Sequence, residues 1–225
     1  MQRTKAMPAA RTTELLVATS NPHKLTELRA IFEPLGFTAV GLDYLGRQFP
    51  EPYEDGSTFE ENAAKKALSY AFLTDRICLA DDSGLEVDAL KGEPGVQSAV
   101  WAGRGATRAE RDAANNLRLM AEMDGVAPAQ RGARYVCCIC VAAPDGRILA
   151  TSRGEMTGRV TVGKARGSHG FGYDPLIELS DGRTVAEIPE ADKNAQSHRS
   201  VAARAIAPRI AEVLRQASSS ERTSR

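Results

Sequence analysis

Apolar positions along the chain predict short buried strands that alternate with helices. Residues 14–19 (ELLVAT) form an apolar run of strand length. Four apolar residues follow it at helical spacing: Leu25, Leu28, Ile31 and Phe32. Asn21 and Pro22 predict the start of this helix, because asparagine caps helices and proline is favoured at the first helical position. Gly36 predicts its end.

Capping-box patterns, a threonine with a glutamate three residues later, predict two further helices that begin after Thr58 and Thr107. The first should run to about Thr74, and a second buried strand, RICLA (76–80), follows it. The other helix should carry three residues on one face: Ala113, Leu117 and Met120.

The second half of the chain predicts a β-hairpin, a glycine-rich loop and a last helix. ARYVCCICVAA, the turn APDGR and ILATSRGEM have the pattern of two strands joined by a turn. The loop covers 163–175, and the last helix should begin near Ser197. Pro208 should kink or interrupt that helix. Three of its residues are expected to face inwards: Val201, Ala205 and Ile206.

Composition indicates an ordinary globular protein. The chain has 225 residues, 42% of them hydrophobic and 26% charged, and we expect one domain at 13–215 between disordered tails at 1–12 and 216–225. Its 29 lysines and arginines equal its 29 aspartates and glutamates, so no net field attracts nucleic acid or a membrane surface. Any anion-binding site must be local.

Cysteine usage and the apolar runs predict a cytoplasmic protein. Three of the four cysteines lie in CCIC (Cys137, Cys138 and Cys140), where strand neighbours point to opposite faces and form disulfides poorly. The paired spacing of a zinc site is missing, so we interpret them as small core residues. No apolar run reaches the roughly 18 residues that span a bilayer, and the first residues have no secretion-signal core.

The segment after the first predicted strand, ATSNPHK, is typical of a phosphate-binding helix start. Thr19, Ser20 and Asn21 lead into a helix N-terminus, where free N–H groups, the helix dipole and Lys24 would together bind a phosphate. The alternative is a plain helix cap with Lys24 on a solvated face, and this segment alone supports both equally. It is not a P-loop, because GxxxxGK[ST] is missing.

Two acidic clusters suggest a metal site. Asp81 and Asp82 follow the strand at 76–80, and in open α/β sheets ligands bind beyond the carboxyl ends of strands. Glu54 and Asp55 lie just before a helix. Such carboxylates suit magnesium, which takes one or two of them together with substrate phosphates. For Glu54 or Asp55 alone, the favoured alternative is a charge that complements the helix dipole.

Two later stretches could recognise a nucleotide base. GSHGFGYDP combines glycines that permit close approach with two aromatic rings able to stack on a flat base. ADKNAQSHRS gathers Lys193, His198 and Arg199 at a helix start. That cluster predicts a reader of anions or base edges, with a solvated basic helix end as the alternative.

Five segments in order resemble the signatures of the inosine/xanthosine triphosphate pyrophosphatase family: ATSNPHKLTEL, DGSTFEENAAKKA, ADDSGLEVDALKGEPGVQSA, GFGYDP and DKNAQSHR. The resemblance covers residues 14 to about 207. It implies an α/β fold with a long twisted mixed sheet flanked by helices, and two lobes around a central cleft. It also implies a homodimeric enzyme that uses Mg²⁺ to hydrolyse ITP, dITP and XTP to a nucleoside monophosphate and pyrophosphate.

The resemblance also assigns roles to residues. It makes Asp82 catalytic, and we expect this carboxylate to accept the proton from the attacking water. Glu54 and Asp82 would hold the metal, with Asp55 open as an alternative ligand and Asp81 as an assisting one. Within the base-binding residues that the resemblance implies, we expect Phe171 to stack on the base and Arg199 to meet its 6-carbonyl. The implied substrate-binding residues are Thr19, Ser20, Asn21, Pro22, His23, Lys24, Ser83, Phe171, Gly172, Tyr173, Asp174, Lys193, His198 and Arg199.

Three alternatives are weighed against this interpretation. A nucleotide sensor would keep Lys24 and the FGYD loop, but it would not need Asp82 and the acidic cluster. A nucleic-acid-binding module would show a basic, aromatic-rich surface, and zero net charge with 5% aromatic residues argues against it. Among enzymes, the nearest alternative is a pyrophosphatase for modified pyrimidine nucleotides.

Overall fold

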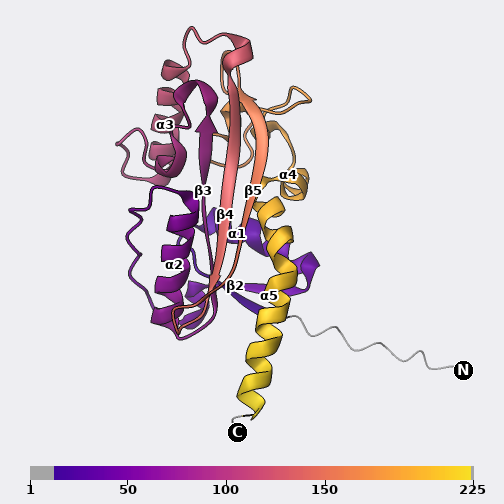
Figure 1. Ribbon diagram of the computed structural model, residues 1–225. Helices are drawn as coiled ribbons and strands as arrows, with labels where there is room; N and C mark the ends of the chain where they lie inside the picture. The colour runs from indigo at the N-terminus through magenta and orange to yellow at the C-terminus, as the bar shows by residue number, and fades with distance from the viewer. Residues whose placement is uncertain (1–12, 224–225) are drawn as a thin grey trace, which may run out of the picture.

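The computed structural model describes residues 13–223, which form one mixed sheet with helices on both faces (Figure 1). The strands are β1 (Thr13–Val17), β2 (Phe37–Gly41), β3 (Cys78–Val87), β4 (Gly132–Ala142), β5 (Ile148–Val160) and β6 (Ile177–Glu178). The α-helices are α1 (Pro22–Phe32), α2 (Phe59–Thr74), α3 (Arg108–Glu122), α4 (Glu190–Gln196) and α5 (His198–Thr223). The predicted tail at 1–12 lies outside the described residues.

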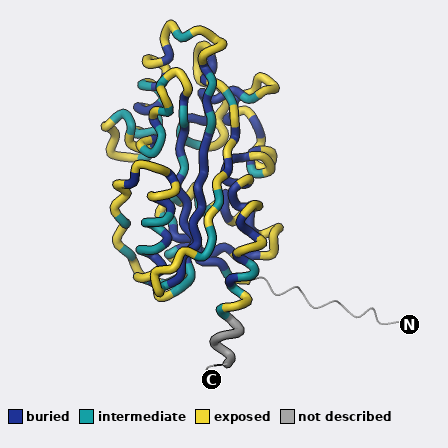
Figure 2. Tube along the Cα trace, in the orientation of Figure 1, coloured by how far each residue is buried: buried dark blue, intermediate teal, exposed yellow. Residues whose placement is uncertain are grey.

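The sheet has the order β2-β1-β3-β4-β5-β6. β1 pairs in parallel with β2 and β3, and the remaining pairs are antiparallel, so the sheet is mixed as predicted. The long strands β3, β4 and β5 run along most of the molecule (Figure 1). The buried backbone follows these strands, with exposed loops around them (Figure 2).

The molecule has two lobes that contain three apolar cores. Two cores lie on opposite faces of the sheet in one lobe, and the third core forms the other lobe. α1 and α5 cover one face of the sheet, where Leu28 and Ile206 are among the buried residues, and α2 covers the opposite face through residues such as Ala67. The third core lies at the far ends of β3 to β5, where α3 packs through Leu119 and Met123. No helix of the described chain is long and apolar enough to cross a membrane.

β3 is longer than the strand predicted at 76–80, and this changes the setting of the acidic pair. Asp81 and Asp82 lie inside β3 and pair with Ile139 and Cys138 of β4. The prediction that the pair follows the strand is therefore wrong. Hydrogen bonding to the 11-residue β4 continues the strand through two charged residues that would end an isolated one.

Two helices bury a face other than the one that the sequence pattern suggests, and the inward positions predicted for the last helix are wrong at Val201 and Ala205. On α3, Leu117 and Met120 are exposed to 61% and 37%. The buried residues of that helix are Ala114, Asn115 and Leu119. On α5, Val201 and Ala205 are exposed, whereas Ile206 is buried as predicted.

The close packing of α5 on β5 explains which of its faces is buried. A Cβ on Gly154 of β5 would lie 2.2 Å from the His198 carbonyl oxygen and 2.4 Å from the Ala202 nitrogen. Glycine at this position thus lets the backbone of α5 approach β5 closely, and Ala202 and Ala203 are buried there whereas Val201 is 44% exposed. α5 also continues through Pro208 to Thr223, past the predicted interruption and past residue 216, where a disordered tail was expected.

Candidate active site

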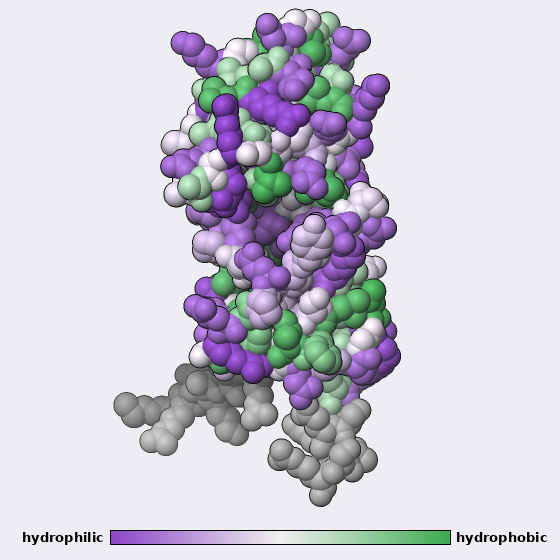
Figure 3. Space-filling model, turned by 90° about the vertical axis from the view of Figure 1, so that its left-hand side faces the viewer, coloured by the Kyte–Doolittle hydropathy of each residue, from purple (hydrophilic) through white to green (hydrophobic). Residues whose placement is uncertain are grey.

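Most of the predicted site residues line one cleft between the lobes. Its walls come from the start of α1, the middle of β3, the segment before α2, the first turn of α3, the loop before β6, and α4 and α5. Fourteen predicted residues line it: Thr19, Ser20, Asn21, Lys24, Glu54, Asp82, Ser83, Phe171, Gly172, Tyr173, Asp174, Lys193, His198 and Arg199. The middle of the face in Figure 3 is indented and mainly hydrophilic.

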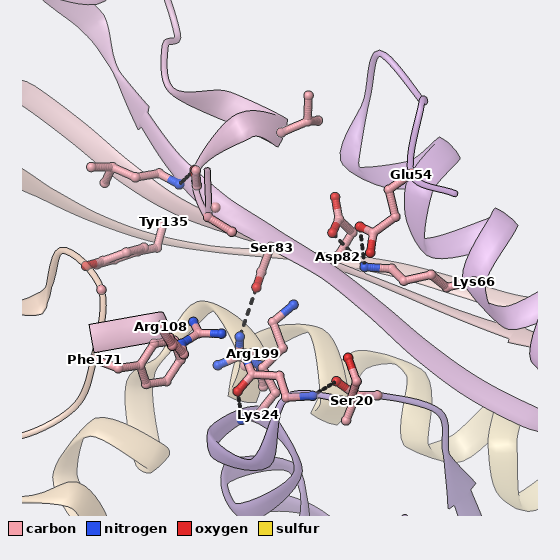
Figure 4. A pocket seen from close by; sticks show the side chains of 18 of the residues that line it. Ser20, Lys24, Glu54, Lys66, Asp82, Ser83, Arg108, Tyr135, Phe171 and Arg199 are labelled. Carbon is pink, nitrogen blue, oxygen red and sulfur yellow. Dashed lines mark hydrogen bonds and ion pairs between the residues drawn. The ribbon is translucent and has the colours of Figure 1, made fainter. Parts of the chain in front are cut away.

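The cleft has two chemically different ends (Figure 4). The acid end consists of Glu54, Lys66 and Asp82. The aromatic end consists of Arg108, Tyr135 and Phe171, with Ser83 and Arg199 between the two ends. Pro22 and His23 do not line the cleft, although the His23 ring stacks on Phe171 with 5.3 Å between centroids.

At the acid end, Lys66 of α2 holds two carboxylates. Its Nζ lies 2.7 Å from Asp82 Oδ1 and 3.0 Å from Glu54 Oε2. Asn62, one helical turn before Lys66, lies with Nδ2 3.4 Å from Asp82 Oδ2. Burial raises the pKa of the Asp82 carboxyl above its ordinary value, although the ammonium groups of Lys66 and Lys24 act in the opposite direction. Asp82 is thus a buried acid at the wall of a polar cleft, a usual setting for a catalytic base.

Asp81 lies on the opposite face of β3, because neighbouring strand residues point to opposite sides. Its side chain is fully buried, with Oδ2 3.0 Å from Lys24 Nζ and 3.5 Å from Arg199 Nε. Burial would raise the pKa of the Asp81 carboxyl, but the charges of Lys24, Arg199 and Lys66 together hold it well below its usual range. Asp81 is therefore a permanent counter-charge that positions two cations, and it does not line the cleft.

The start of α1 differs in one respect from the phosphate-binding helix start that the sequence predicts. The Asn21 side chain accepts hydrogen bonds from the N–H groups of His23 and Lys24, and Pro22 has no N–H to offer. The N–H groups expected to be free are thus used within the cap. What remains for an anion is the helix dipole, the Ser20 hydroxyl and the Lys24 ammonium.

A buried ion-pair network supports the aromatic end. Glu27 of α1 accepts from Lys193 at 2.9 Å and from Arg199, and Lys193 also contacts Asp174 at 2.7 Å. The Tyr135 hydroxyl donates to the second oxygen of Asp174 at 2.9 Å. Burial opposes ionisation of Glu27, but the charges of Arg199 and Lys193 lower the pKa of its carboxyl below its ordinary value. The network fixes the side chains of α4 and α5 relative to α1.

His198 is held as a neutral ring beside this network. Its imidazole stacks on Tyr135 with 5.0 Å between centroids and an interplanar angle of 15°. Burial lowers the pKa of His198 well below its ordinary value, and the charges of Arg199 and Lys193 add to this effect. Its Nδ1 is buried without a hydrogen-bond partner, which leaves it available to a ligand.

The donor set of the acid end fits magnesium. Among residues 13–223, no three His, Cys, Asp or Glu side chains form a complete metal cage. Two carboxylates that meet at one ammonium group are nevertheless a set that magnesium uses when phosphates and water supply the other ligands. Asp55 instead forms an exposed ion pair with Lys65, away from the cleft, so the geometry favours Glu54 as the ligand.

Sequence reasoning missed Lys66, Glu27, Tyr135 and Arg108. A signal for Lys66 was present, because Asn62, Lys66 and Tyr70 recur every four residues and so share one face of α2. Glu27 has a weaker signal, as an acid beside the apolar Leu28 in the middle of a helix.

The fold and the cleft together define a mixed α/β protein with a polar cleft lined by basic and acidic side chains. Residues 15–209 match the model of the Ham1 family, and the chain belongs to this family. This confirms the family resemblance and the fold class inferred from the sequence.

Relatives and solved structures agree with this assignment. The chain is 48% identical to the dITP/XTP pyrophosphatase of Geobacter sulfurreducens over 188 residues, which cover 83% of this chain and 91% of that protein. It is 45% identical to the dITP/XTP pyrophosphatase of Frankia alni over 203 residues, 89% of this chain and 98% of that protein. The structure of the Staphylococcus aureus Ham1 protein is similar with a TM-score of 0.74 and 33% identity, over 89% of this chain and 99% of that one.

Proposed function

We propose that this chain hydrolyses ITP, dITP and XTP to the nucleoside monophosphate and pyrophosphate, and so removes deaminated purines from the nucleotide pool. The observation that carries the proposal is Asp82, a buried carboxylate that lines the cleft and is held by Lys66 and Asn62. The family and the names of its relatives support the same substrates.

The chain's own residues supply charge and position. The triphosphate binds between the start of α1 and the acid end, where Lys24 and Lys66 offset part of its negative charge. Glu54 and Asp82 would hold Mg²⁺, which when bound neutralises phosphate charge and polarises the phosphorus under attack.

Asp82 accepts the proton of the water that attacks the α-phosphorus, and pyrophosphate leaves. Because burial raises the pKa of Asp82, this carboxylate is a stronger base than an exposed aspartate. Lys66 keeps it ionised and oriented. Asp82 lines the cleft, so its carboxylate is open to a water bound there, as a general base requires.

The aromatic end selects the base. Phe171 stacks on the purine, and an Arg199 N–H meets the 6-carbonyl that hypoxanthine and xanthine share. The guanidinium already donates to Ser83 Oγ at 2.9 Å and to Glu27, so it is fixed before the ligand arrives. Adenine carries an amino donor at this position, which would face the guanidinium N–H without an acceptor between the two donors.

Three further features belong to the proposal: Mg²⁺ as cofactor, a homodimer, and a cytoplasmic location. All four cysteines are free and buried, as suits a reducing compartment. Exposed apolar residues such as Phe72 and Tyr44 supply surface that a second copy could cover. Sedimentation of the purified chain tests the dimer.

The deciding experiment measures pyrophosphate release from ITP, XTP, GTP and ATP, with and without Mg²⁺. We expect turnover of ITP and XTP that depends on Mg²⁺ and much slower turnover of ATP. Release of inorganic phosphate in place of pyrophosphate would contradict the proposed bond cleavage. Tight binding of ITP without turnover would support the sensor instead.

A further inference from the structure

Arg108, the first residue of α3, places its guanidinium over the ring of Phe171. Its Cζ lies 5.1 Å from the ring centroid, and the side chain lines the cleft (Figure 4). Arg108 Nε is buried without a hydrogen-bond partner. A planar cation therefore occupies part of the space where a base would stack on Phe171.

Arg108 is weakly paired in comparison with the other cations of the cleft. Its ion-pair contact is with Asp112, at 3.8 Å from Nε to Oδ2, and the same Asp112 oxygen already accepts the Gly172 N–H at 3.1 Å. The remaining cations each have a closer carboxylate partner: Lys24 on Asp81, Lys66 on Asp82 and Glu54, Lys193 on Asp174 and Glu27, and Arg199 on Glu27. Among these cations, the Arg108 guanidinium is therefore the least neutralised by a nearby carboxylate and the most available to an anionic ligand.

Arg108 is also able to move. Its side chain is 34% exposed, whereas Lys193, which also contacts the Phe171 ring, is buried and fixed by two carboxylates. A flat base between Phe171 and Arg108 needs a gap of about 7 Å, twice the usual contact distance. The guanidinium would have to move outwards by about 2 Å, which a partly exposed side chain can do without breaking a close ion pair.

The two substrate bases differ in charge. The xanthine ring of XTP loses a proton close to neutral pH, whereas the hypoxanthine ring of ITP stays neutral until the solution is clearly alkaline. A guanidinium that stacks on the base thus gains an ionic attraction for deprotonated xanthine alone.

We propose that Arg108 is a specificity-determining residue, which covers the outer face of the base and favours the anionic form of xanthine over hypoxanthine. This inference rests on the proposed function and deepens it, because it names the residue that ranks two substrates of the same site. Arg108 contributes little to ITP and increasingly to XTP as the pH rises.

The other charged groups around the proposed base site do not produce the same pH-dependent preference as Arg108. Asp174, Glu27 and Asp81 are locked in ion pairs with Lys193, Lys24 and Arg199, and His198 is buried and neutral. Asp112, on the same helix as Arg108, opposes an anionic base in every variant. His23 stacks on the Phe171 ring with 5.3 Å between centroids and is the same in every variant, so it does not change the comparison between them.

The test compares XMP with IMP binding by calorimetry, and XTP with ITP turnover, from about pH 5 to about pH 8. The variants are Arg108→Gln, which removes the charge, and Arg108→Lys, which keeps it. Arg111→Gln is the matched control, because Arg111 lies one turn along α3 and donates to the Ala106 carbonyl outside the cleft.

We expect the XMP-to-IMP affinity ratio of the unmodified chain to rise with pH, and Arg108→Gln to lower it about fivefold at the alkaline end with little change at the acid end. Arg108→Lys should keep most of the rise, and Arg111→Gln all of it. An unchanged ratio in Arg108→Gln would overturn the inference, as would an equal loss for XMP and IMP. Because monophosphate binding needs no turnover, a chain that bound both ligands without hydrolysis would refute the proposed function and still test Arg108.

Discussion

The two faces of β3 carry one aspartate each, and the two residues have opposite environments. Asp81 faces α1 and α5, where it is fully buried against Lys24 and Arg199, and its pKa lies well below the usual range. Asp82 faces α2 and the cleft, where it contacts Lys66, and its pKa is raised by burial. Adjacent residues of one type thus differ through the strand alternation alone.

The two environments suit two different roles, since Asp81 stabilises the fold and Asp82 supplies reactivity. A carboxylate whose charged form is favoured, such as Asp81, stabilises the fold. A carboxylate whose charged form is disfavoured, such as Asp82, costs stability and is maintained for its reactivity. Substitutions at these two positions should therefore affect stability and activity differently.

Asp82→Asn should lower kcat for ITP about 10²- to 10⁴-fold, because an amide cannot accept the proton of water. Its free energy of unfolding should stay equal or rise, since a buried charge with a raised pKa is removed. Steady-state kinetics and chemical denaturation measure the two effects. Asp55→Asn, which changes an exposed acid near the same helix, should leave kcat unchanged. Full activity of Asp82→Asn would refute the catalytic role.

Asp81→Asn should destabilise the protein by about 3 kcal/mol, because it leaves Lys24 and part of Arg199 without their counter-charge in a buried site. The loss of kcat should be much smaller than for Asp82→Asn at temperatures where the variant is folded. Asp181→Asn breaks an exposed pair with Arg183 and is the matched control. Equal stability of the Asp81 and Asp181 variants would contradict the distinction between the two faces.

Signals that act within a few residues were sufficient to predict much of the fold. Asn21 and Thr58 cap their helices as expected, α2 ends at Thr74, and Thr107 forms a complete capping box with Glu110. The hairpin of β4 and β5 also follows from local patterns. These features depend on neighbours in sequence, which the chain shows directly.

Features that depend on distant partners could not be predicted in the same way. The extension of β3 through Asp81 needs β4, more than 50 residues later along the chain, as its Ile139 partner shows. The contact between Glu27 and Arg199 joins residues 172 positions apart. The buried face of α5 is the one that packs on Gly154 of β5, at a distant position in the sequence. In the site, the resemblance supplied residues of the cleft and made Asp82 catalytic, but only the structure shows that Asp81 is buried against Lys24 and does not line the cleft.

Tyr135→Phe should destabilise the protein by about 2 kcal/mol, because Asp174 then loses a donor to a buried carboxylate oxygen. The effect tests whether the stability of the protein depends on every hydrogen-bond partner of buried Asp174, as it is expected to depend on the ion pairs of Asp81. Thermal unfolding measures it, with Tyr44→Phe at an exposed position as the control. KM for ITP should rise more than kcat falls, since Asp174 and Lys193 support base binding and touch no reacting atom.

His198 gives the smallest effect and a pH signature. A histidine ionises near pH 6.5 when unfolded, and burial lowers the pKa of His198 well below that in the folded protein. The unfolded chain therefore binds one more proton than the folded chain below about pH 6.5, so this stability is fully present above that pH and is lost as the pH falls towards the folded pKa. The slope contributed is about 1.4 kcal/mol per pH unit. Urea denaturation between about pH 6.5 and about pH 5 should show it in the unmodified chain and in the exposed control His169→Asn, but not in His198→Asn. An equal slope in all three proteins would show that His198 gains its proton without unfolding, and that the aromatic end is open to water.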